Sequence, residues 1–228
     1  MLFLAVLLLA GAAEPDVKAV IDEATNAIGA AGLTSIVYSG AAATGNFGQS
    51  RTISFGLAST SIRNYTRAID FAQPASRATG DVSYEQVITP ANAAWAQQLQ
   101  IWVTPWGFLK GAAANNATLR TKKIDGVAYR VVTWSPPQKA PSGQPYQVVG
   151  YINPHNLIDR VETWVEHPVL GDLHLEAFYA GYQDIGGLTV PTRMSQKQVG
   201  MEITGNGVSG RANGDRPAHL VKSRVKCV

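Results

Sequence analysis

Alternation of apolar and polar side chains constrains the fold of this chain most strongly, and it is clearest between residues 146 and 204. Within this region Leu188, Val190 and Met194 share one parity, whereas the opposite parity is polar: Thr189, Arg193, Ser195 and Lys197. A period of two is typical of an antiparallel strand with one face in a core and the other in water. The region is therefore predicted to be a run of such strands.

Turn-forming residues set the expected limits of these strands. Turns are predicted at residues 153–156 (Asn-Pro-His-Asn), at Gly171-Asp172 and at Gly186-Gly187. The strands between them are 146–152, 157–165, 173–182 and 188–196, followed by a last run through Met201 and Ile203. Upstream, Asp125-Gly126 predicts a two-residue hairpin turn between 122–124 and 127–134. Further short extended runs are expected at 35–38, 51–55, 62–71 and 84–88, with a loop over 40–50.

Two helices are predicted. Apolar residues recur at helical spacing from Val17 to Ala31, which indicates a helix with one buried stripe. Thr104-Pro105 supplies an N-cap hydroxyl and a proline at the first helical position, so a short helix is expected to follow. A sheet of about ten strands must curl. We therefore expect a mainly β (α+β) fold: one large curved antiparallel sheet, or half-barrel, with both helices on its concave side.

The termini differ in composition from the rest of the chain. Residues 1–13 combine an apolar run, Leu2 to Leu9, with small residues, which predicts a signal peptide too short to be a stable membrane anchor. Residues 14–210 are expected to form one domain, followed by a basic tail over 211–228. The net charge of only +3 argues against nucleic-acid binding. Export without a disulfide, since Cys227 is the one cysteine, favours a bacterial periplasmic or secreted protein.

No recognised catalytic motif occurs in the sequence, so a non-catalytic protein is expected, with no cofactor and no metal. The motif Gly-x-Ser-x-Gly, the Walker loop and the dinucleotide fingerprint are absent. His167 and His174, with Glu166 and Asp172, could form a polar cluster across a hairpin, but this pattern is more typical of surface residues than of a zinc site. The carboxylates of Glu162, Glu166 and Glu176 on adjacent strands raise an acid/base pair as an alternative. Cross-strand ion pairs on a solvated face explain them more simply.

Aromatic side chains provide the best candidate for a functional site. Several of them surround the short helix after Thr104, either to plug the sheet or to form a wall for an apolar ligand. The candidates for lining an apolar cavity are Tyr38, Tyr65, Phe71, Trp102, Trp106, Phe108, Trp134, Tyr151, Trp164 and Phe178. Sequence alone does not separate cavity lining from core packing, because burial stabilises either arrangement.

Several stretches of the sequence resemble known families. The early helix followed by IVYSG, GYINPHNLIDRVETW and AGYQDIGGLTVPTR resembles the layout of the LolA/LolB lipoprotein-carrier superfamily, which implies a half-barrel that holds acyl chains. The stretches TPWGFLKGAAANNAT, INPHNLIDRVETWVEHPVLGD and GYQDIGGLTVPTRMSQKQVG resemble the non-catalytic N-terminal domain of secreted bacterial metallo-β-lactamase-fold hydrolases. The metal motif of the hydrolase half, His-x-His-x-Asp-His, is absent, so the resemblance implies no catalytic residue here.

Two functions follow as leading hypotheses, and an enzyme in its own right is the third and weakest. The first is an exported binding module that holds a lipid or another apolar small molecule. The second is an accessory domain that docks onto a metallo-β-lactamase-fold hydrolase domain or onto a second copy of itself as a homodimer. The first predicts an apolar cavity of several hundred Å³. The second predicts an exposed apolar patch.

Overall fold

A computed structural model describes residues 16–45, 59–81, 86–167 and 171–207 of the 228-residue chain. The predicted signal peptide, the predicted strand 51–55, the basic tail 211–228 and Cys227 lie outside the described residues. For residues 201–207 only the backbone is described.

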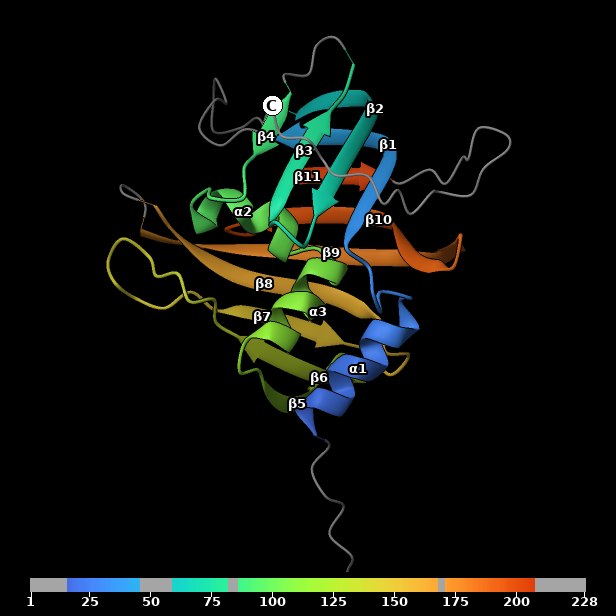
Figure 1. Cartoon of the computed structure of the whole chain (residues 1–228), viewed down its shortest axis with the longest axis vertical. Helices are drawn as coiled ribbons and strands as arrows, with labels where there is room; N and C mark the ends of the chain where they lie inside the picture. Colours follow the sequence, from blue (N-terminus) through green and yellow to red (C-terminus); the bar gives the residue numbers. More distant parts are fainter. Residues whose placement is uncertain (1–15, 46–58, 82–85, 168–170, 208–228) are drawn as a thin grey trace, which may run out of the picture.

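The described strands form a single antiparallel sheet of 11 strands (Figure 1). Along the sheet the order is β4-β3-β2-β1-β11-β10-β9-β8-β7-β6-β5. The strands are β1 (Ser35–Gly45), β2 (Ser59–Asp70), β3 (Ala75–Thr79), β4 (Val87–Thr89), β5 (Thr118–Ile124), β6 (Val127–Trp134), β7 (Val148–Ile152), β8 (Ile158–His167), β9 (Gly171–Ile185), β10 (Leu188–Gln198) and β11 (Met201–Gly207).

Pairing of β1 with β11 joins two sequential halves of the sheet. Strands β1 to β4 follow one another on one side of this junction, and β11 back to β5 follow one another on the other. The junction pairs residues 41–44 with residues 204–207. Because β4 and β5 are the two opposite edges, the chain between them must cross the whole sheet.

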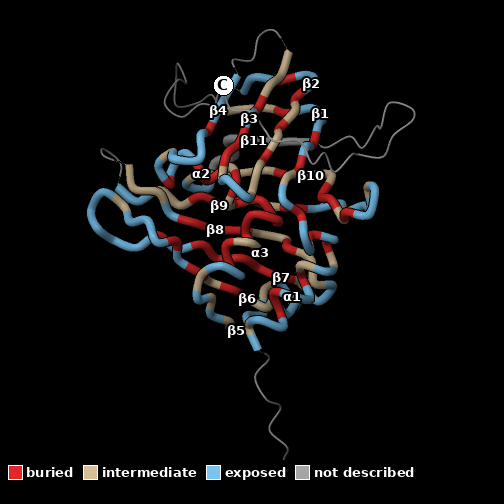
Figure 2. The backbone as a smooth tube through the Cα atoms, in the orientation of Figure 1, coloured by how far each residue is buried: buried red, intermediate tan, exposed pale blue. Residues whose placement is uncertain are grey.

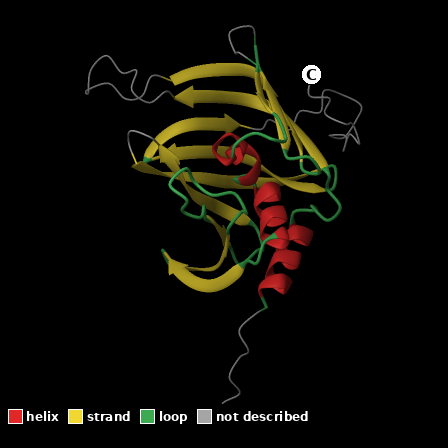
Figure 3. Cartoon of the chain, turned by 60° about the vertical axis from the view of Figure 1, so that its left-hand side comes forward, coloured by secondary structure: helices red, strands yellow, loops and turns green. Residues whose placement is uncertain are grey.

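That crossing is made by two helices, α2 (Trp95–Trp102) and α3 (Pro105–Ala114). Figure 3 shows the sheet bending around them, with α1 (Val17–Ala27) beside α3. The mainly β half-barrel with an N-terminal helix and a mid-chain helix on its concave side is therefore confirmed. The helix α2 was not predicted; it is short, and Ala94 gives it no side-chain cap.

The core lies between the helices and the concave face of the sheet. Helix α1 contributes Val20, Ile21 and Ala24, the stripe predicted from its spacing. It ends before Gly29, whose φ of +68° suits glycine and stops the helix earlier than expected. Figure 2 shows buried backbone concentrated along α3 and the neighbouring strands β7 and β8. On β10 the predicted inward residues Leu188, Val190 and Met194 are all buried.

Local turn chemistry was read correctly at some positions and wrongly at others. Asp125 and Gly126 both have positive φ, 48° and 84°, as the predicted two-residue hairpin requires. In contrast, Gly171 and Asp172 belong to β9 rather than to a turn, because β8 runs on to His167 and pairs with them. Residues 168–170, between β8 and β9 in the sequence, lie outside the described residues.

In the first half of the sheet one prediction was wrong and one strand was missed. Residues 40–45, expected in a loop, extend β1 because backbone hydrogen bonding to β2 on one side and β11 on the other holds them extended. Strand β3 was not predicted; it pairs with both β2 and β4. None of the helices in the described ranges has the length and apolar character needed to cross a membrane.

Candidate functional site

The α2–α3 pair is fixed on the concave face by its own sequence. The Thr104 hydroxyl accepts a hydrogen bond from the Gly107 amide at 3.1 Å and donates one to the Ile101 carbonyl at 2.7 Å, which caps α3 and ties it to the end of α2. A Cβ at Gly107 would overlap the Ile101 carbonyl oxygen, so this tight junction requires glycine. The predicted start of α3 at Thr104-Pro105 is confirmed.

Four aromatic side chains, here called the aromatic cluster, pack against one another where α2 meets the sheet: Trp95, Trp102, Trp134 and Tyr146. Trp95 stacks on Trp102 with ring centroids 6.1 Å apart and meets Trp134 edge-on at 5.9 Å. Tyr146 lies 5.7 Å from Trp95. Trp102 also contacts Trp134 edge-on, at 6.0 Å. Offset and edge-on contacts of this kind stabilise aromatic pairs beyond simple burial.

Two aromatic residues of α3, Trp106 and Phe108, extend the aromatic cluster along the sheet. The cluster and these two residues are together called the aromatic wall. Trp106 and Phe108 are fully buried, and Trp106 reaches Tyr38 on β1, with ring centroids 6.2 Å apart. Phe108 packs directly on Gly150 of β7, where a Cβ would overlap its ring. Gly111 similarly makes room for the Trp134 ring. The helix approaches the sheet this closely because these glycines carry no side chain.

Three indole N–H groups in this wall lack acceptors among the residues that the structure describes. The Nε1 atoms of Trp95, Trp106 and Trp134 are shielded from solvent and have no hydrogen-bond partner. Trp102 differs, since its Nε1 donates to the Gln98 side chain at 3.1 Å. A buried donor without an acceptor costs about 1–3 kcal/mol. The closed packing of the helices on the sheet therefore carries an energetic cost.

Polar contacts hold the α2–α3 junction to β9 and β10. The amides of Gln100 and Gln196 exchange hydrogen bonds of 3.0 and 3.2 Å. The Tyr179 hydroxyl donates to the Val103 carbonyl. Burial raises the pKa of the Tyr179 and Tyr38 hydroxyls well above the usual tyrosine range, so both remain neutral donors.

A second polar spot lies on the concave side of β2. Arg67 is buried at 6% exposure, and its Nε donates to the Tyr65 hydroxyl at 2.7 Å. Its guanidinium also reaches the Ser76 hydroxyl on β3 at 3.5 Å. This part of the concave face therefore mixes aromatic and cationic character.

The helices largely fill the space that the sheet curves around. Between the α2–α3 junction and strands β1, β9 and β10, the gap lined by Tyr38, Thr104, Tyr179 and Met194 has a volume of only about 10 Å³. A larger depression, about 470 Å³, lies at the rim of the sheet beside Asn116 and is lined mainly by polar side chains. At this junction of described residues, an apolar ligand needs α2 and α3 to move away from the sheet.

The ten aromatic candidates fall on both faces of the sheet. On the concave side lie Tyr38, Tyr65, Phe71, Trp102, Trp106, Phe108 and Trp134, all of them in or packed against the main core. On the convex side lie Tyr151, Trp164 and Phe178, because they have the opposite parity to the core residues Val161 and Ala177. The sheet separates these three from the rest, so a single cavity lined by all ten is not possible. The ligand-binding role of the seven concave residues stays a prediction.

Among the described residues, buried aromatic residues of the main core that were missing from the predicted set include Trp95, Tyr146 and Tyr179. Tyr179 shares its parity with Leu175 and Ala177, so the alternation along β9 was the signal that could have found it. Trp95 belongs to the aromatic residues that surround Thr104 in the sequence, so this local clustering was the signal for it.

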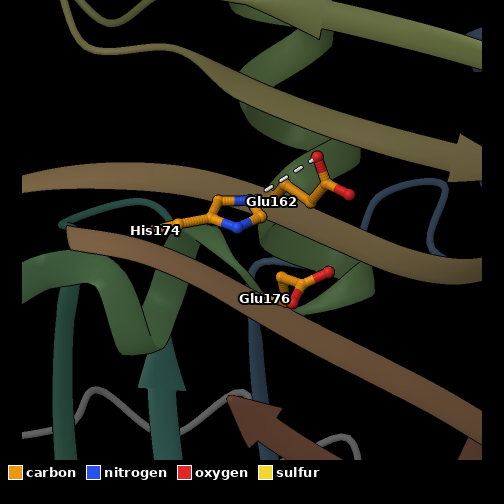
Figure 4. Close-up of side chains that lie close together, drawn as sticks. All are labelled: Glu162, His174 and Glu176. Atoms are coloured by element: carbon orange, nitrogen blue, oxygen red, sulfur yellow. Dashed lines mark ion pairs between the residues drawn. The ribbon is translucent and has the colours of Figure 1, made fainter. Parts of the chain in front are cut away.

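Four polar side chains lie together on the convex face and are here called the convex cluster: Arg160, Glu162, His174 and Glu176. Figure 4 shows the last three. Arg160 bridges the two carboxylates, at 3.0 Å from Glu162 and 3.5 Å from Glu176. His174 Nε2 lies 3.7 Å from Glu162 Oε2, and its ring stacks on Trp164 at 4.9 Å. Cross-strand ion pairs were expected here; the expected solvated face was not found at Glu162, which is 8% exposed.

Register decides which polar residues meet on β8 and β9. Glu162 stands directly opposite Glu176, and Trp164 opposite His174. Glu166 faces Asp172 instead, and His167 pairs with Gly171. The suggested cluster of His167 and His174 therefore does not form, because the register places the two histidines on opposite faces of the sheet.

Comparisons with known proteins address the fold. The sequence matches no protein-family model, and the search of curated proteins gives no match. Three solved structures are similar. A LolA superfamily protein from Nitrosomonas europaea has a TM-score of 0.54 at 14% identity, covering 86% of this chain and 92% of its own. A putative outer membrane lipoprotein-sorting protein domain from Vibrio parahaemolyticus has a TM-score of 0.52 at 10% identity, covering 88% and 95%.

The third is a DUF1329 family protein from Desulfovibrio piger, with a TM-score of 0.50 at 13% identity, covering 89% of this chain and 96% of its own. Similarity at such low identity concerns the fold alone. The chain has a LolA-like half-barrel layout, as the sequence resemblance implied.

Proposed function

We propose that this protein is a non-catalytic binding module that takes an apolar chain, such as an acyl chain, between the α2–α3 helices and the concave face of the sheet. The observation that carries the proposal is the aromatic wall with three buried indole donors that lack acceptors. An acyl ester offers both an apolar chain for the rings and carbonyl oxygens for the N–H groups. A purely structural core would gain nothing from three unpaired donors.

Binding requires the helices to open. Closed packing leaves about 10 Å³ at the α2–α3 junction, whereas small-molecule sites usually measure about 300–1,000 Å³. The side-chain hydrogen bonds that tie α2 and its junction to β9 and β10 are the Gln100–Gln196 pair and the Tyr179–Val103 contact. The cost of breaking them is offset in part when the ligand provides acceptors for the indole donors.

Acyl chains of a lipid or lipidated protein are the proposed ligand class. One structural neighbour is a LolA superfamily protein and another is described as a lipoprotein-sorting domain, which supports this choice. The apolar run Leu2 to Leu9 supports export to a bacterial periplasm, where such ligands would be met. We propose residues 14–210 as the binding domain.

The alternative is an accessory domain for a metallo-β-lactamase-fold hydrolase or a homodimer. Such a function calls for a continuous exposed apolar patch. The exposed large apolar side chains of the described residues are instead spread over several elements: Val37, Val87, Ile88, Val127, Trp164 and Val199. This distribution favours the binding module.

The distribution of tryptophans provides the test. Of the 5 tryptophans, Trp95, Trp102, Trp106 and Trp134 lie on the concave side and Trp164 on the convex side. Bromine atoms quench tryptophan only on close approach. We expect 9,10-dibromostearate to quench the purified full chain saturably, and unbrominated stearate to compete.

The matched control is Trp164→Phe, which removes only the convex tryptophan. Quenching should be retained in this variant if the acyl chain enters the concave face. Loss of quenching in Trp164→Phe would place the ligand on the convex face instead. Absence of saturable quenching in the parent chain would overturn the proposal.

A further inference from the structure

We propose that the convex cluster is a binding site for a divalent cation of the zinc type, held by Glu162, His174 and Glu176. The potential ligand atoms of these three residues all lie within 4.8 Å of one another. Glu162 and Glu176 face each other across β8 and β9, and His174 is two residues before Glu176 on the same face. The site lies on the opposite side of the sheet from the aromatic wall, so it is independent of the proposed apolar ligand.

The imidazole of His174 supplies the strongest indication. Its Nε2 atom is shielded from solvent and has no hydrogen-bond partner within the described ranges of the chain. Stacking on Trp164 at 4.9 Å holds the ring plane, so that Nε2 points toward Glu162 Oε2 at 3.7 Å. That separation is too long for a hydrogen bond. A metal ion placed between the two atoms would give Nε2 a partner and would share Glu162 Oε2 with the Tyr151 hydroxyl, which donates to it at 3.2 Å.

The distance between His174 and Glu162 suits zinc after a small contraction, and Glu176 lies within 4.8 Å of both. Zinc bonds to imidazole nitrogen and carboxylate oxygen are about 2.0–2.2 Å long, so ligand atoms on a tetrahedral zinc lie roughly 3.3 Å apart. The separation of 3.7 Å between His174 Nε2 and Glu162 Oε2 is close to this value. Three protein ligands leave the fourth position for water, and one imidazole with two carboxylates suits zinc and cobalt.

Charge also favours a cation at this place. Two carboxylates directly opposite each other on neighbouring strands repel, and Glu162 is buried. Arg160 contacts the Oε1 atom of each carboxylate, which leaves Glu162 Oε2 toward His174. Lys197 stands across from Glu176, but its ammonium lies 5.1 Å over the Phe178 ring and forms no ion pair with that carboxylate. Arg160 is thus the cation with which a metal ion competes.

Metal titration of the full chain tests this proposal. Because Cys227 could bind zinc, Cys227→Ser serves as the background, treated with EDTA and dialysed. Zinc binding is measured by calorimetry and cobalt binding by visible absorption. We expect one equivalent to bind, and both His174→Ala and Glu176→Gln to weaken binding by at least ~10-fold. The control His155→Ala removes an exposed imidazole in the 153–156 turn and should bind as the background does.

Arg160→Gln separates a metal site from a simple ion-pair network. Removing the competing guanidinium should strengthen zinc binding several-fold while His174→Ala weakens it. Circular dichroism of each variant verifies that it is folded. The proposal is overturned if zinc binds equally to the background and to folded His174→Ala or Glu176→Gln. Failure of both the background and Arg160→Gln to bind one equivalent would also overturn it.

Discussion

Gln100 of α2 and Gln196 of β10 exchange two amide hydrogen bonds, of 3.0 and 3.2 Å, although they lie 96 residues apart in the sequence. Their contact fastens the helical crossing to the centre of the sheet. Beside it, the Tyr179 hydroxyl holds the Val103 carbonyl at the α2–α3 junction. In the proposed binding mode these contacts are the ones that must break for a ligand to enter.

Gln100→Ala is predicted to favour opening. Loss of the amide pair should lower the free energy of unfolding by about 1 kcal/mol, since a partly buried hydrogen bond contributes about that much. The same free energy shifts the closed–open equilibrium, so dibromostearate quenching in stopped-flow experiments should become roughly 5-fold faster. Gln97→Ala, an exposed glutamine on the same helix, is the control. Equal quenching rates in the two variants would contradict the proposal that Gln100 holds α2 closed against β10.

Gly150→Ala is predicted to destabilise the fold through overpacking. A Cβ at this position overlaps the Phe108 ring, which is itself fully buried. We expect the free energy of unfolding in urea to fall by about 1–3 kcal/mol. A smaller side chain at position 108 should relieve part of the overlap. The double variant Gly150→Ala/Phe108→Leu should therefore lose less unfolding free energy than the two single variants lose together. A Gly150→Ala protein as stable as the parent would show that α3 does not pack this closely.

Alkaline pH is predicted to destabilise the protein through its buried tyrosines. Burial raises the pKa of Tyr179 and of Tyr38, whereas in the unfolded chain both ionise near the ordinary tyrosine pKa of about 10. Above about pH 10 the unfolded state therefore binds fewer protons than the folded state, and stability falls by up to ~1.4 kcal/mol per pH unit for each tyrosine. Below that pH the contribution is fully present.

Tyr179→Phe provides the check on this pH dependence. Urea unfolding of the parent and the variant at several pH values between 9 and 11 should give a shallower decline for the variant, by one tyrosine's share. The variant also loses the hydrogen bond to Val103, so it should be less stable than the parent at neutral pH. Parallel declines in the two proteins would contradict the assignment.

Arg160→Gln is predicted to destabilise the metal-free protein. The substitution leaves Glu162 and Glu176 opposite each other without the guanidinium that bridges them. We expect a loss of about 2 kcal/mol in the presence of EDTA, below the cost of a fully buried pair because Arg160 is partly exposed. Adding Glu176→Gln removes the repulsion, and most of the lost stability should return.

An exposed ion pair on α1 is the control for this cycle. Lys18 and Asp22 lie 2.6 Å apart with side chains 77% and 56% exposed, so Lys18→Gln should change stability by less than about 0.5 kcal/mol. If Arg160→Gln had an effect equally small, the convex cluster would contribute no more than an ordinary surface pair.

Much of the fold could be predicted from the sequence because its signals are local. Alternation located β7, β8 and β10, the Asp125-Gly126 pair fixed the β5–β6 hairpin, and Thr104-Pro105 fixed the start of α3. Each depends on a few neighbouring residues whose backbone preferences or side-chain periodicity decide the outcome. Helix α2 escaped prediction because its 8 residues have no side-chain cap.

The candidate site was less predictable, because faces and register depend on distant contacts. Aromatic residues occur on either face of a central strand, so the buried Tyr151 and the half-buried Phe178 resembled concave residues although they lie on the convex side. Trp164 shares its parity with Glu162, and that signal could have excluded it from the concave set. Placing the β8–β9 turn at Gly171-Asp172 also concealed the meeting of Glu162, His174 and Glu176.

The sequence by itself determined the strands, the α1 stripe, the α3 cap and the β half-barrel class, since these follow from periodicity and turn chemistry within short segments. Only the tertiary structure decided that β1 pairs with β11, that α2 and α3 cross between opposite sheet edges, and which side chains share a face. The physical reason is that such contacts join residues far apart in the chain. The free energy of these contacts comes from packing and strand pairing once the whole sheet has formed, and no local preference encodes it.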